Sequence, residues 1–264
     1  MEAPFSRTEI LLGTAAVEKL AAARVAVFGL GGVGSYAAEA LARSGIGHLS
    51  LIDHDRVSQS NLNRQLPATL DTLGQLKVEV MARRIGRINP KAVVETHPIF
   101  YGPGEGGELF NLGFDYIVDA LDTVSAKVDL IVKSRELAIP IVSAMGAGNR
   151  LDPRLFQVAD ISASHTCPLA RVMRRELRRR GLQGGVKVVF STEPPLKPRA
   201  ELGEGQVAGA SGRGIIGSIA FVPPVAGLFL AGVVVRDILA MGEGEEERHG
   251  CWGTKGQNAL GPVK

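Results

Sequence analysis

The sequence predicts an α/β fold, a Rossmann-like, doubly wound and mostly parallel sheet with a C-terminal extension of extra strands and helices. Up to about residue 150, short apolar runs rich in β-branched residues alternate with helical patterns. A glycine-rich turn follows the first apolar run and opens a helix. The chain has 33 glycines and only 5% aromatic residues, a composition that suits many tight turns.

The first half of the chain alternates helices and strands in order. Ser44-Gly45 ends the Ala-rich helix that leaves the glycine turn, and Asn89-Pro90 ends the next, amphipathic helix. The expected elements are a helix over 15–23, a strand over 25–28, a helix over 33–43, a strand over 48–53, a helix over 76–88, a strand over 92–98, a strand over 116–119, a helix over 124–137 and a strand over 140–144.

After residue 150 the pattern changes. We expect strands over 155–161 and 186–191, a very basic helix over 168–180, a mobile loop over 197–214 and a frayed tail over 242–264. The apolar stretch from 215 to 230, which continues to 241, contains Pro223-Pro224, and Arg236-Asp237 comes after residue 230. These residues favour a buried strand, a turn and a buried helix over 225–240 rather than a membrane span. The whole chain is expected to be one domain, with a nucleotide-binding half (about 1–150), a substrate-facing half (about 151–241) and the tail.

Composition and charge narrow the classes of function. A net charge of +3 means that any nucleic-acid contact must come from a local cluster of basic residues. The two cysteines, Cys167 and Cys251, form no C-x-x-C pair, so neither a zinc knuckle nor a disulfide framework is supported. The first 20 residues lack the apolar core of a signal peptide, and we expect a cytoplasmic protein.

The glycine-rich turn indicates a nucleotide. Gly29, Gly31, Gly32 and Gly34 fit G-x-G-x-x-G between a strand and a helix, where backbone N–H groups and the helix dipole favour phosphate. Asp53 ends the second strand, 19 residues after Gly34, where a carboxylate can accept hydrogen bonds from ribose hydroxyls. This pattern alone does not separate NAD from ATP.

Polar residues beyond Asp53 favour ATP. The segment from Asp53 to Gln65 is unlike that of a dehydrogenase, and it supplies Arg64, which with Lys77 can neutralise a triphosphate. Asp119 and Asp122 end the fourth strand as a pair of carboxylates suited to Mg²⁺. An NAD-dependent oxidoreductase would leave these groups unexplained, and a non-catalytic nucleotide-dependent scaffold would not need them.

The run from Arg7 to Ala144 resembles the ThiF/MoeB/HesA adenylating enzymes, which are related to ubiquitin-activating enzymes. The resemblance lies in GxGGVGS, (L/I)xDxD with Asp53 and Asp55, S-N-L-x-R-Q, a following Lys, and D-x-x-D. It implies that Asp53 holds the ribose, that Asn61, Arg64 and Lys77 contact the phosphates, and that Asp122 serves Mg²⁺. It also implies a homodimer in which Arg7 reaches into the partner's ATP site.

Later segments resemble the tRNA threonylcarbamoyladenosine dehydratase branch of this family. They include Cys167-Pro168-Leu169-Ala170-Arg171, the stretch from Val189 to Pro195, and the stretch from Gly217 to Gly227. The resemblance implies cyclisation of a tRNA nucleoside through an acyl-adenylate, with a sulfur-transfer protein as a further candidate partner. The alternative is an adenylyltransferase that activates the C-terminal Gly of a ubiquitin-like sulfur carrier, but such enzymes typically carry two C-x-x-C pairs.

The basic helix gives independent support for an RNA substrate. Its arginines are numerous for a chain whose net charge is only +3, and such a cluster is typical of a surface that contacts a phosphate backbone. The apolar stripe that would pack the helix against the rest of the protein is Leu169, Val172, Met173 and Leu177. The candidate tRNA-binding residues are Arg171, Arg174, Arg175, Arg178 and Arg179. The alternative is a solvated helix face partly neutralised by Glu176.

Several reactive residue types are not assigned a role. Cys167 precedes a helix start and could be a nucleophile, but an inert or partly buried thiol is the simpler interpretation. His54 is expected to face away from Asp53 and Asp55 and to be structural. His165, Cys251 and Trp252 receive no role.

Overall fold

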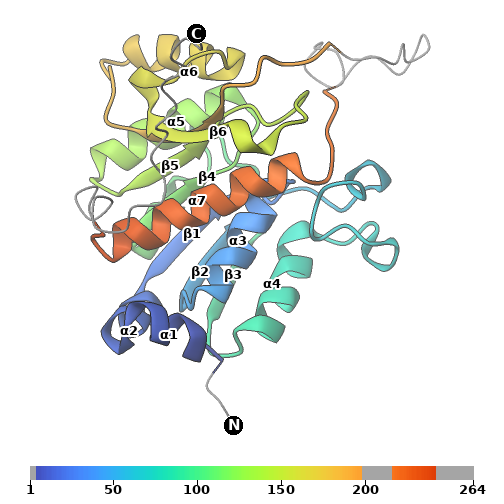
Figure 1. The fold of residues 1–264 in the computed structure, drawn as a ribbon, viewed down its shortest axis with the longest axis vertical. Helices are drawn as coiled ribbons and strands as arrows, with labels where there is room; N and C mark the ends of the chain where they lie inside the picture. Colours follow the sequence, from blue (N-terminus) through green and yellow to red (C-terminus); the bar gives the residue numbers. More distant parts are fainter. Residues whose placement is uncertain (1–3, 198–215, 242–264) are drawn as a thin grey trace, which may run out of the picture.

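A seven-stranded sheet forms the centre of the part of the chain that the computed structural model describes, residues 4–197 and 216–241 (Figure 1). The strand order is β3-β2-β1-β4-β5-β7-β6, and neighbouring strands are parallel except for β6, which runs antiparallel to β7. The strands are β1 (Arg24–Phe28), β2 (His48–Ile52), β3 (Val93–His97), β4 (Tyr116–Asp119), β5 (Ile141–Ala144), β6 (Phe156–Asp160) and β7 (Lys187–Ser191). The prediction of a mostly parallel α/β sheet is confirmed.

Helices cover both faces of the sheet. Helices α2, α3, α4 and α7 pack on one face, which is turned toward the viewer in Figure 1, and α5 and α6 pack on the other. The helices are α1 (Ser6–Leu12), α2 (Thr14–Ala22), α3 (Gly34–Arg43), α4 (Lys77–Ile88), α5 (Val124–Glu136), α6 (Pro168–Arg178) and α7 (Val222–Ile238). Short 3-10 turns are η1 (Gln59–Asn61), η2 (Leu70–Thr72), η3 (Gly107–Leu112), η4 (Pro153–Leu155) and η5 (Ile161–Ala163).

The alternation of side chains along each strand divides the core in two. In β1, Val25 and Val27 join the cluster under α3 and α7, whereas Ala26 and Phe28 join the cluster under α5 and α6. All four side chains are at most 1% exposed. Burial on both faces explains why these strands read as continuous apolar runs rather than as alternating ones.

The order of the strands reverses between β1 and β4. The chain leaves β1 into α3 on one face of the sheet and leaves β4 into α5 on the other. Two connections that diverge in this way open a crevice at the carboxyl ends of the strands, which is where open α/β sheets bind ligands.

Two expectations about the C-terminal part are corrected. Residues 216–220 form no strand, and α7 begins at Val222 instead of 225. Pro223 and Pro224 lie inside the first turn of α7, where backbone N–H groups have no intrahelical acceptor and proline is therefore tolerated. Of the helices in the described ranges, none has the length and apolar character needed to cross a bilayer. Residues 198–214 of the expected loop and the expected tail, with Cys251 and Trp252, lie outside the described residues.

Candidate active site

A cavity of 680 Å³ opens at the carboxyl ends of the parallel strands. Its walls come from the glycine loop after β1, the segment after β2 that includes η1, the start of α4, and the loops after β4 and β5. The segment after β3 (99–101), the segment before α7 and Leu169 of α6 also line it. The cavity therefore occupies the crevice that the strand order predicts.

Two glycines of the loop are required by close backbone packing. Gly29 has φ +88°, and a Cβ at this position would lie 2.7 Å from the carbonyl oxygen of Ala120. A Cβ on Gly34 would lie 1.8 Å from the carbonyl oxygen of Gly29. Gly29, Gly31 and Gly32 line the cavity, whereas Gly34 does not, so the packing of α3 against the loop accounts for Gly34.

Asp53 connects the end of β2 to the glycine loop. Its Oδ2 accepts a hydrogen bond of 2.6 Å from the backbone N–H of Leu30, and its Oδ1 accepts one of 2.8 Å from the N–H of Asp55. The residue is only 8% exposed but lines the cavity. Each carboxylate oxygen keeps a free acceptor site, so the residue can still accept a hydrogen bond from a ligand.

Two cations lie in the wall next to the glycine loop. The Nζ of Lys77, the first residue of α4, lies 2.7 Å from Oδ2 of Asp55, and the Lys77 side chain is 5% exposed. Arg64 donates from Nη1 to the carbonyl oxygen of Ser60 and to Oδ1 of Asn63, each at 2.8 Å. Burial lowers the pKa of the Arg64 guanidinium, which nevertheless stays protonated because its ordinary value is so high.

Asn61 also lies in this wall, and its side chain already has a partner. Its Oδ1 accepts a hydrogen bond of 3.1 Å from the backbone N–H of Ser58, which caps η1. The side-chain amide nitrogen of this buried residue is left to donate, and the residue lines the cavity. Asn61, Arg64 and Lys77 thus line the same cavity as the glycine loop, and their contact with phosphates stays a prediction.

The expected pair of carboxylates is not formed. Asp122 is exposed and lines the cavity, but Asp119 is 0% exposed and points beneath the loop. Oδ2 of Asp119 lies 2.9 Å from Nζ of Lys127 and accepts a 2.6 Å hydrogen bond from Ser143, while its Oδ1 accepts one from the N–H of Leu121. Asp119 is therefore a buried structural anion, and the prediction that it shares a metal with Asp122 is wrong.

The expectation that His54 faces away from Asp53 and Asp55 is also wrong. His54 lines the cavity instead of facing away from it, with Nε2 lying 3.3 Å from Oδ1 of Asp55 and the ring packed edge-on against Phe100. Asp53, His54 and Asp55 offer ligand atoms within 4.8 Å of one another. Two of these groups are already bonded, however, Asp53 to backbone N–H groups and Asp55 to Lys77.

The opposite wall was missed by sequence reasoning. It consists mainly of small and apolar residues that follow β5, together with one residue of α6 and two residues that precede α7. These are Met145, Gly146, Ala147, Gly148, Leu169, Ile216 and Ser218. The motif GAG after β5 was the one local indication of a second turn at this edge of the sheet. Cys167 is buried next to this wall, 2% exposed, and does not line the cavity.

The basic helix α6 exposes only part of its arginine set. The side chains of Arg171 and Arg178 are exposed and make no hydrogen bond or ion pair with another described residue, whereas those of Arg175 and Arg179 pair with Glu176. Arg174 is half-buried, and its Nη1 donates to the carbonyl oxygen of Ser164, at 2.6 Å, which holds the end of η5 against the helix. The buried stripe is Ala170, Met173 and Leu177, with Leu169 and Val172 half-buried.

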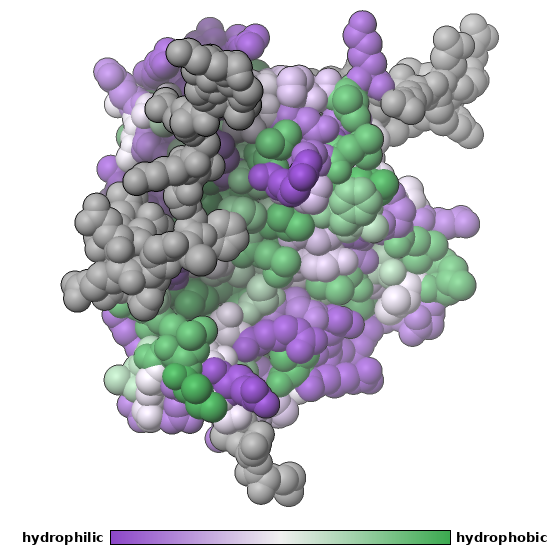
Figure 2. Space-filling model, in the orientation of Figure 1, coloured by the Kyte–Doolittle hydropathy of each residue, from purple (hydrophilic) through white to green (hydrophobic). Residues whose placement is uncertain are grey.

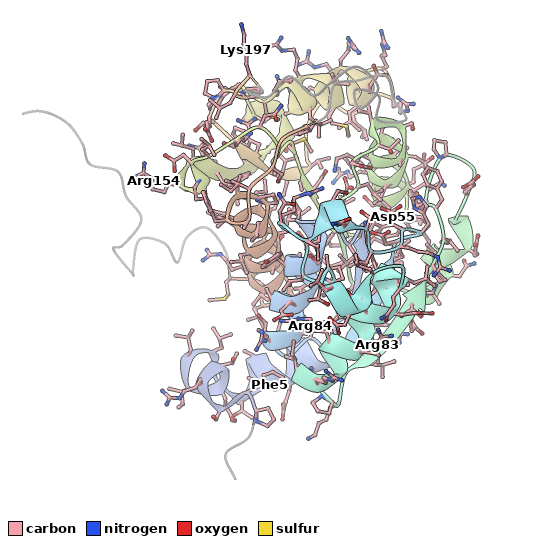
Figure 3. The ribbon with its side chains drawn as sticks, turned by 90° about the vertical axis from the view of Figure 1, so that its right-hand side faces the viewer. Phe5, Asp55, Arg83, Arg84, Arg154 and Lys197 are labelled. Carbon is pink, nitrogen blue, oxygen red and sulfur yellow. The ribbon has the colours of Figure 1, made fainter. Side chains whose placement is uncertain are left out.

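Arg7 lies outside the cavity of its own chain. It is exposed on α1, two residues after Phe5, and Figure 3 shows Phe5 near the lower end of the molecule with Asp55 well above it. Any contact between Arg7 and such a cavity would therefore involve a second copy of the chain.

Comparison with known proteins gives consistent results. The family model described as "ThiF family" matches residues 5–254. The tRNA threonylcarbamoyladenosine dehydratase of Bacillus subtilis is 46% identical over 239 residues, which are 89% of this chain and 94% of that protein. The E. coli tRNA N6-threonylcarbamoyladenosine dehydratase, solved in complex with ATP, has a TM-score of 0.80 at 35% identity and covers 94% of this chain and 96% of its own. An adenylyltransferase and sulfurtransferase of Saccharomyces cerevisiae, UBA4, is 32% identical over 59% of this chain and 35% of its own length.

Proposed function

The chain belongs to the ThiF family, and we propose that it is an ATP-dependent enzyme that cyclises threonylcarbamoyladenosine in tRNA through an acyl-adenylate. The observation that carries the proposal is one cavity with two unlike walls: a glycine loop with two cations on one side, and a small, apolar wall on the other. The first suits a nucleoside triphosphate and the second an uncharged part of a second substrate. The named relatives act on this nucleoside.

The phosphates of ATP are placed along the glycine loop. Backbone N–H groups at Gly31 and Gly32 and the start of α3 favour negative charge, and Asn61, Arg64 and Lys77 continue the same wall. Lys77 must exchange its contact with Asp55 for a phosphate oxygen, or share it between the two. Asp53 stays bonded to Leu30 and accepts from a ribose hydroxyl through its remaining acceptor sites.

The first chemical step forms the adenylate. An oxygen of the substrate carboxylate attacks the α-phosphorus of ATP, and the bond from that phosphorus to pyrophosphate breaks. Arg64 and Lys77 stabilise the negative charge that develops on the phosphoryl and leaving oxygens. Asp122 offers an exposed carboxylate oxygen, the ligand type that Mg²⁺ prefers, so the residues fit this ion. Mg²⁺, when bound, neutralises charge on the phosphates.

The second step closes the ring. The ureido group of the same side chain attacks the activated carbonyl carbon, loses a proton, and AMP departs with one of the original carboxylate oxygens. The nucleoside therefore loses the elements of one water. Because nucleophile and electrophile belong to one molecule, their proximity supplies much of the rate, and no enzyme thiol is needed. The burial of Cys167 agrees with this scheme.

A tRNA contact surface is proposed on α6. Arg171 and Arg178 are exposed and unpaired within the described chain, and Arg175 and Arg179 can exchange Glu176 for phosphate. Arg174 is already bonded inside the protein and is given a smaller part. Leu169 belongs to the same helix and to the cavity wall, so an RNA bound on α6 lies close to the cavity.

A homodimer is proposed on the family resemblance and on exposed apolar side chains. Helix α1, which carries Arg7, exposes Ile10 and Leu11, and α7 exposes Leu228 and Phe229. Figure 2 shows apolar residues gathered at the surface on the face over which α7 runs. Light scattering of the purified protein checks the assembly. We further propose a single adenylating domain over 1–264, a cytoplasmic location and a sulfur-transfer protein as a second partner.

The proposal is tested by incubating the purified protein with ATP, Mg²⁺ and tRNA that bears threonylcarbamoyladenosine, followed by mass spectrometry of the nucleosides. The expected result is loss of one water from that nucleoside, with one AMP released for each conversion. If the nucleoside is unchanged while a ubiquitin-like protein supports pyrophosphate exchange, the enzyme is instead a sulfur-carrier adenylyltransferase.

A further inference from the structure

The apolar wall of the cavity includes a segment that has little structure of its own. Residues 216–220 belong to no helix or strand, yet Ile216 and Ser218 line the cavity. Such a segment keeps one position only if other parts of the chain hold it.

Asn149 holds this segment through both its backbone and its side chain. Its backbone N–H donates to the carbonyl oxygen of Gly217 at 2.8 Å, and its Oδ1 accepts from the N–H of Gly217 at 2.7 Å. Its own carbonyl oxygen accepts from the N–H of Leu196, also at 2.8 Å. One residue thus joins the loop after β5, the segment after β7 and the segment before α7.

The neighbours of Asn149 make it a firm support. Arg150, which is 3% exposed, donates from Nε to the carbonyl oxygen of Gly146 and folds the loop after β5 back on itself. A Cβ on Gly148 would lie 2.1 Å from Cγ2 of Ile216, so the side chain of Ile216 rests directly on this loop. On the other side, Asn63 donates from Nδ2 to the carbonyl oxygen of Ser218 at 3.0 Å.

The backbone of Asn149 explains the choice of residue. Its φ is +57°, the left-handed region, which Asn, Asp and Gly adopt at low cost and most other residues do not. Of these three residues, Gly cannot supply the side-chain acceptor that Gly217 uses, and Asp supplies it with an added negative charge. Asn is the residue that meets both requirements without adding a charge beside an RNA substrate.

We propose that Asn149 is a positioning residue for the modified nucleoside: it fixes the 216–218 wall against which the uncharged part of that nucleoside lies, and it takes no part in ATP binding. The proposal rests on the proposed function. Its basis is that the atoms held by Asn149 belong to the apolar wall. The side-chain hydrogen bonds that the structure gives for Asn61, Arg64 and Lys77 go to Ser58, Ser60, Asn63 and Asp55 and not to the 216–218 segment, which Arg64 reaches only indirectly, through Asn63.

The test is Asn149→Gly, which keeps the backbone conformation and both backbone hydrogen bonds and removes only the side-chain acceptor. We expect the KM for the modified tRNA to rise by about fivefold, the effect of losing one neutral hydrogen bond, with the Kd for ATP unchanged. Amide hydrogen exchange at Gly217 should become faster. Asn149→Asp retains the acceptor and should return KM to within about twofold of wild type in moderate salt, where the added charge is screened.

Ala138→Gly is the matched control, because Ala138 also has a positive φ, +55°, and lines a different cavity. A wild-type KM for tRNA in Asn149→Gly would overturn the proposal, as would an equal loss of ATP affinity, which would point to general damage. If the wild-type enzyme itself leaves the nucleoside unchanged, the proposed function fails. Faster amide exchange at Gly217 in Asn149→Gly than in wild type would still show whether the Asn149 side chain holds the 216–218 segment.

Discussion

Lys127 and Asp119 form an ion pair with no access to water, and breaking it should be costly. Both side chains are 0% exposed, and Nζ of Lys127 lies 2.9 Å from Oδ2 of Asp119 at an angle outside that of a hydrogen bond. Lys127→Met keeps most of the volume but leaves the carboxylate of Asp119 buried with only the Ser143 hydroxyl and the Leu121 N–H as partners. Removal of one partner from a buried pair typically costs about 3–5 kcal/mol.

That loss is a large fraction of the stability of an ordinary domain, about 5–15 kcal/mol. Urea unfolding followed by far-ultraviolet circular dichroism measures it as a lower midpoint at an unchanged slope. The double variant Lys127→Met/Asp119→Asn removes both charges and should recover most of the loss, because the desolvation penalty of the carboxylate disappears with it. A loss below about 1 kcal/mol in the single variant, or a double variant no more stable than the single one, refutes the reasoning.

Four further predictions concern the site and its surroundings. Asp122→Ala should abolish AMP formation with little change in the unfolding midpoint, because Asp122 is an exposed residue of the cavity rim; normal turnover would remove it from the mechanism. Neutralising Arg171 and Arg178 together should weaken tRNA binding and reduce the slope of log Kd against log salt by about 1 per lost phosphate contact, and an unchanged slope would leave α6 as a solvated face. Gly34→Ala should destabilise the protein and weaken ATP binding together, since the new methyl group meets the Gly29 carbonyl; full ATP affinity in a stable variant contradicts the close packing. Burial tends to raise the pKa of Asp160, but hydrogen bonds from Ser162 and from the N–H groups of Gly185 and Val186 outweigh it and lower that pKa. Asp160→Asn should therefore lower the free energy of unfolding at neutral pH, and by progressively less as the pH falls through the pKa of Asp160 in the folded protein. A difference in stability that does not change with pH would argue against this sign.

The nucleotide side of the site could be predicted from the sequence because its signals are local. The glycine loop, Asp53 and the Asn61–Arg64 segment lie next to strand ends that the apolar runs mark clearly, and the strand order then gathers them at one edge. Lys77, the first residue of α4, joins them by the same rule.

Other parts depend on contacts between distant segments. From the sequence, Asp119 is expected to be a carboxylate at the ligand-binding edge of the sheet. Its burial is evident only in the structure, where α5 places Lys127 next to it. In the sequence, Arg174 is one of several arginines expected to be exposed; its contact with Ser164 at the end of η5 is evident only in the structure. Nothing local indicates that residues 216–218 complete the cavity, because their position is set by Asn149, nearly 70 residues earlier.

The pairing of β1 with β4 has a consequence for how the molecule is made. Val25 lies opposite Tyr116, so the first strand of the sheet lacks its inner neighbour until about 90 further residues have been synthesised. At ordinary elongation rates this delay is on the order of ten seconds. The partner helices α3 and α7 are separated by a longer stretch of chain still. During that interval β1 presents one unpaired edge together with an apolar face, which is the kind of surface that chaperones bind and that crowded nascent chains aggregate through. Expression yield should therefore respond to translation speed and chaperone supply more than the stability of the finished fold would suggest.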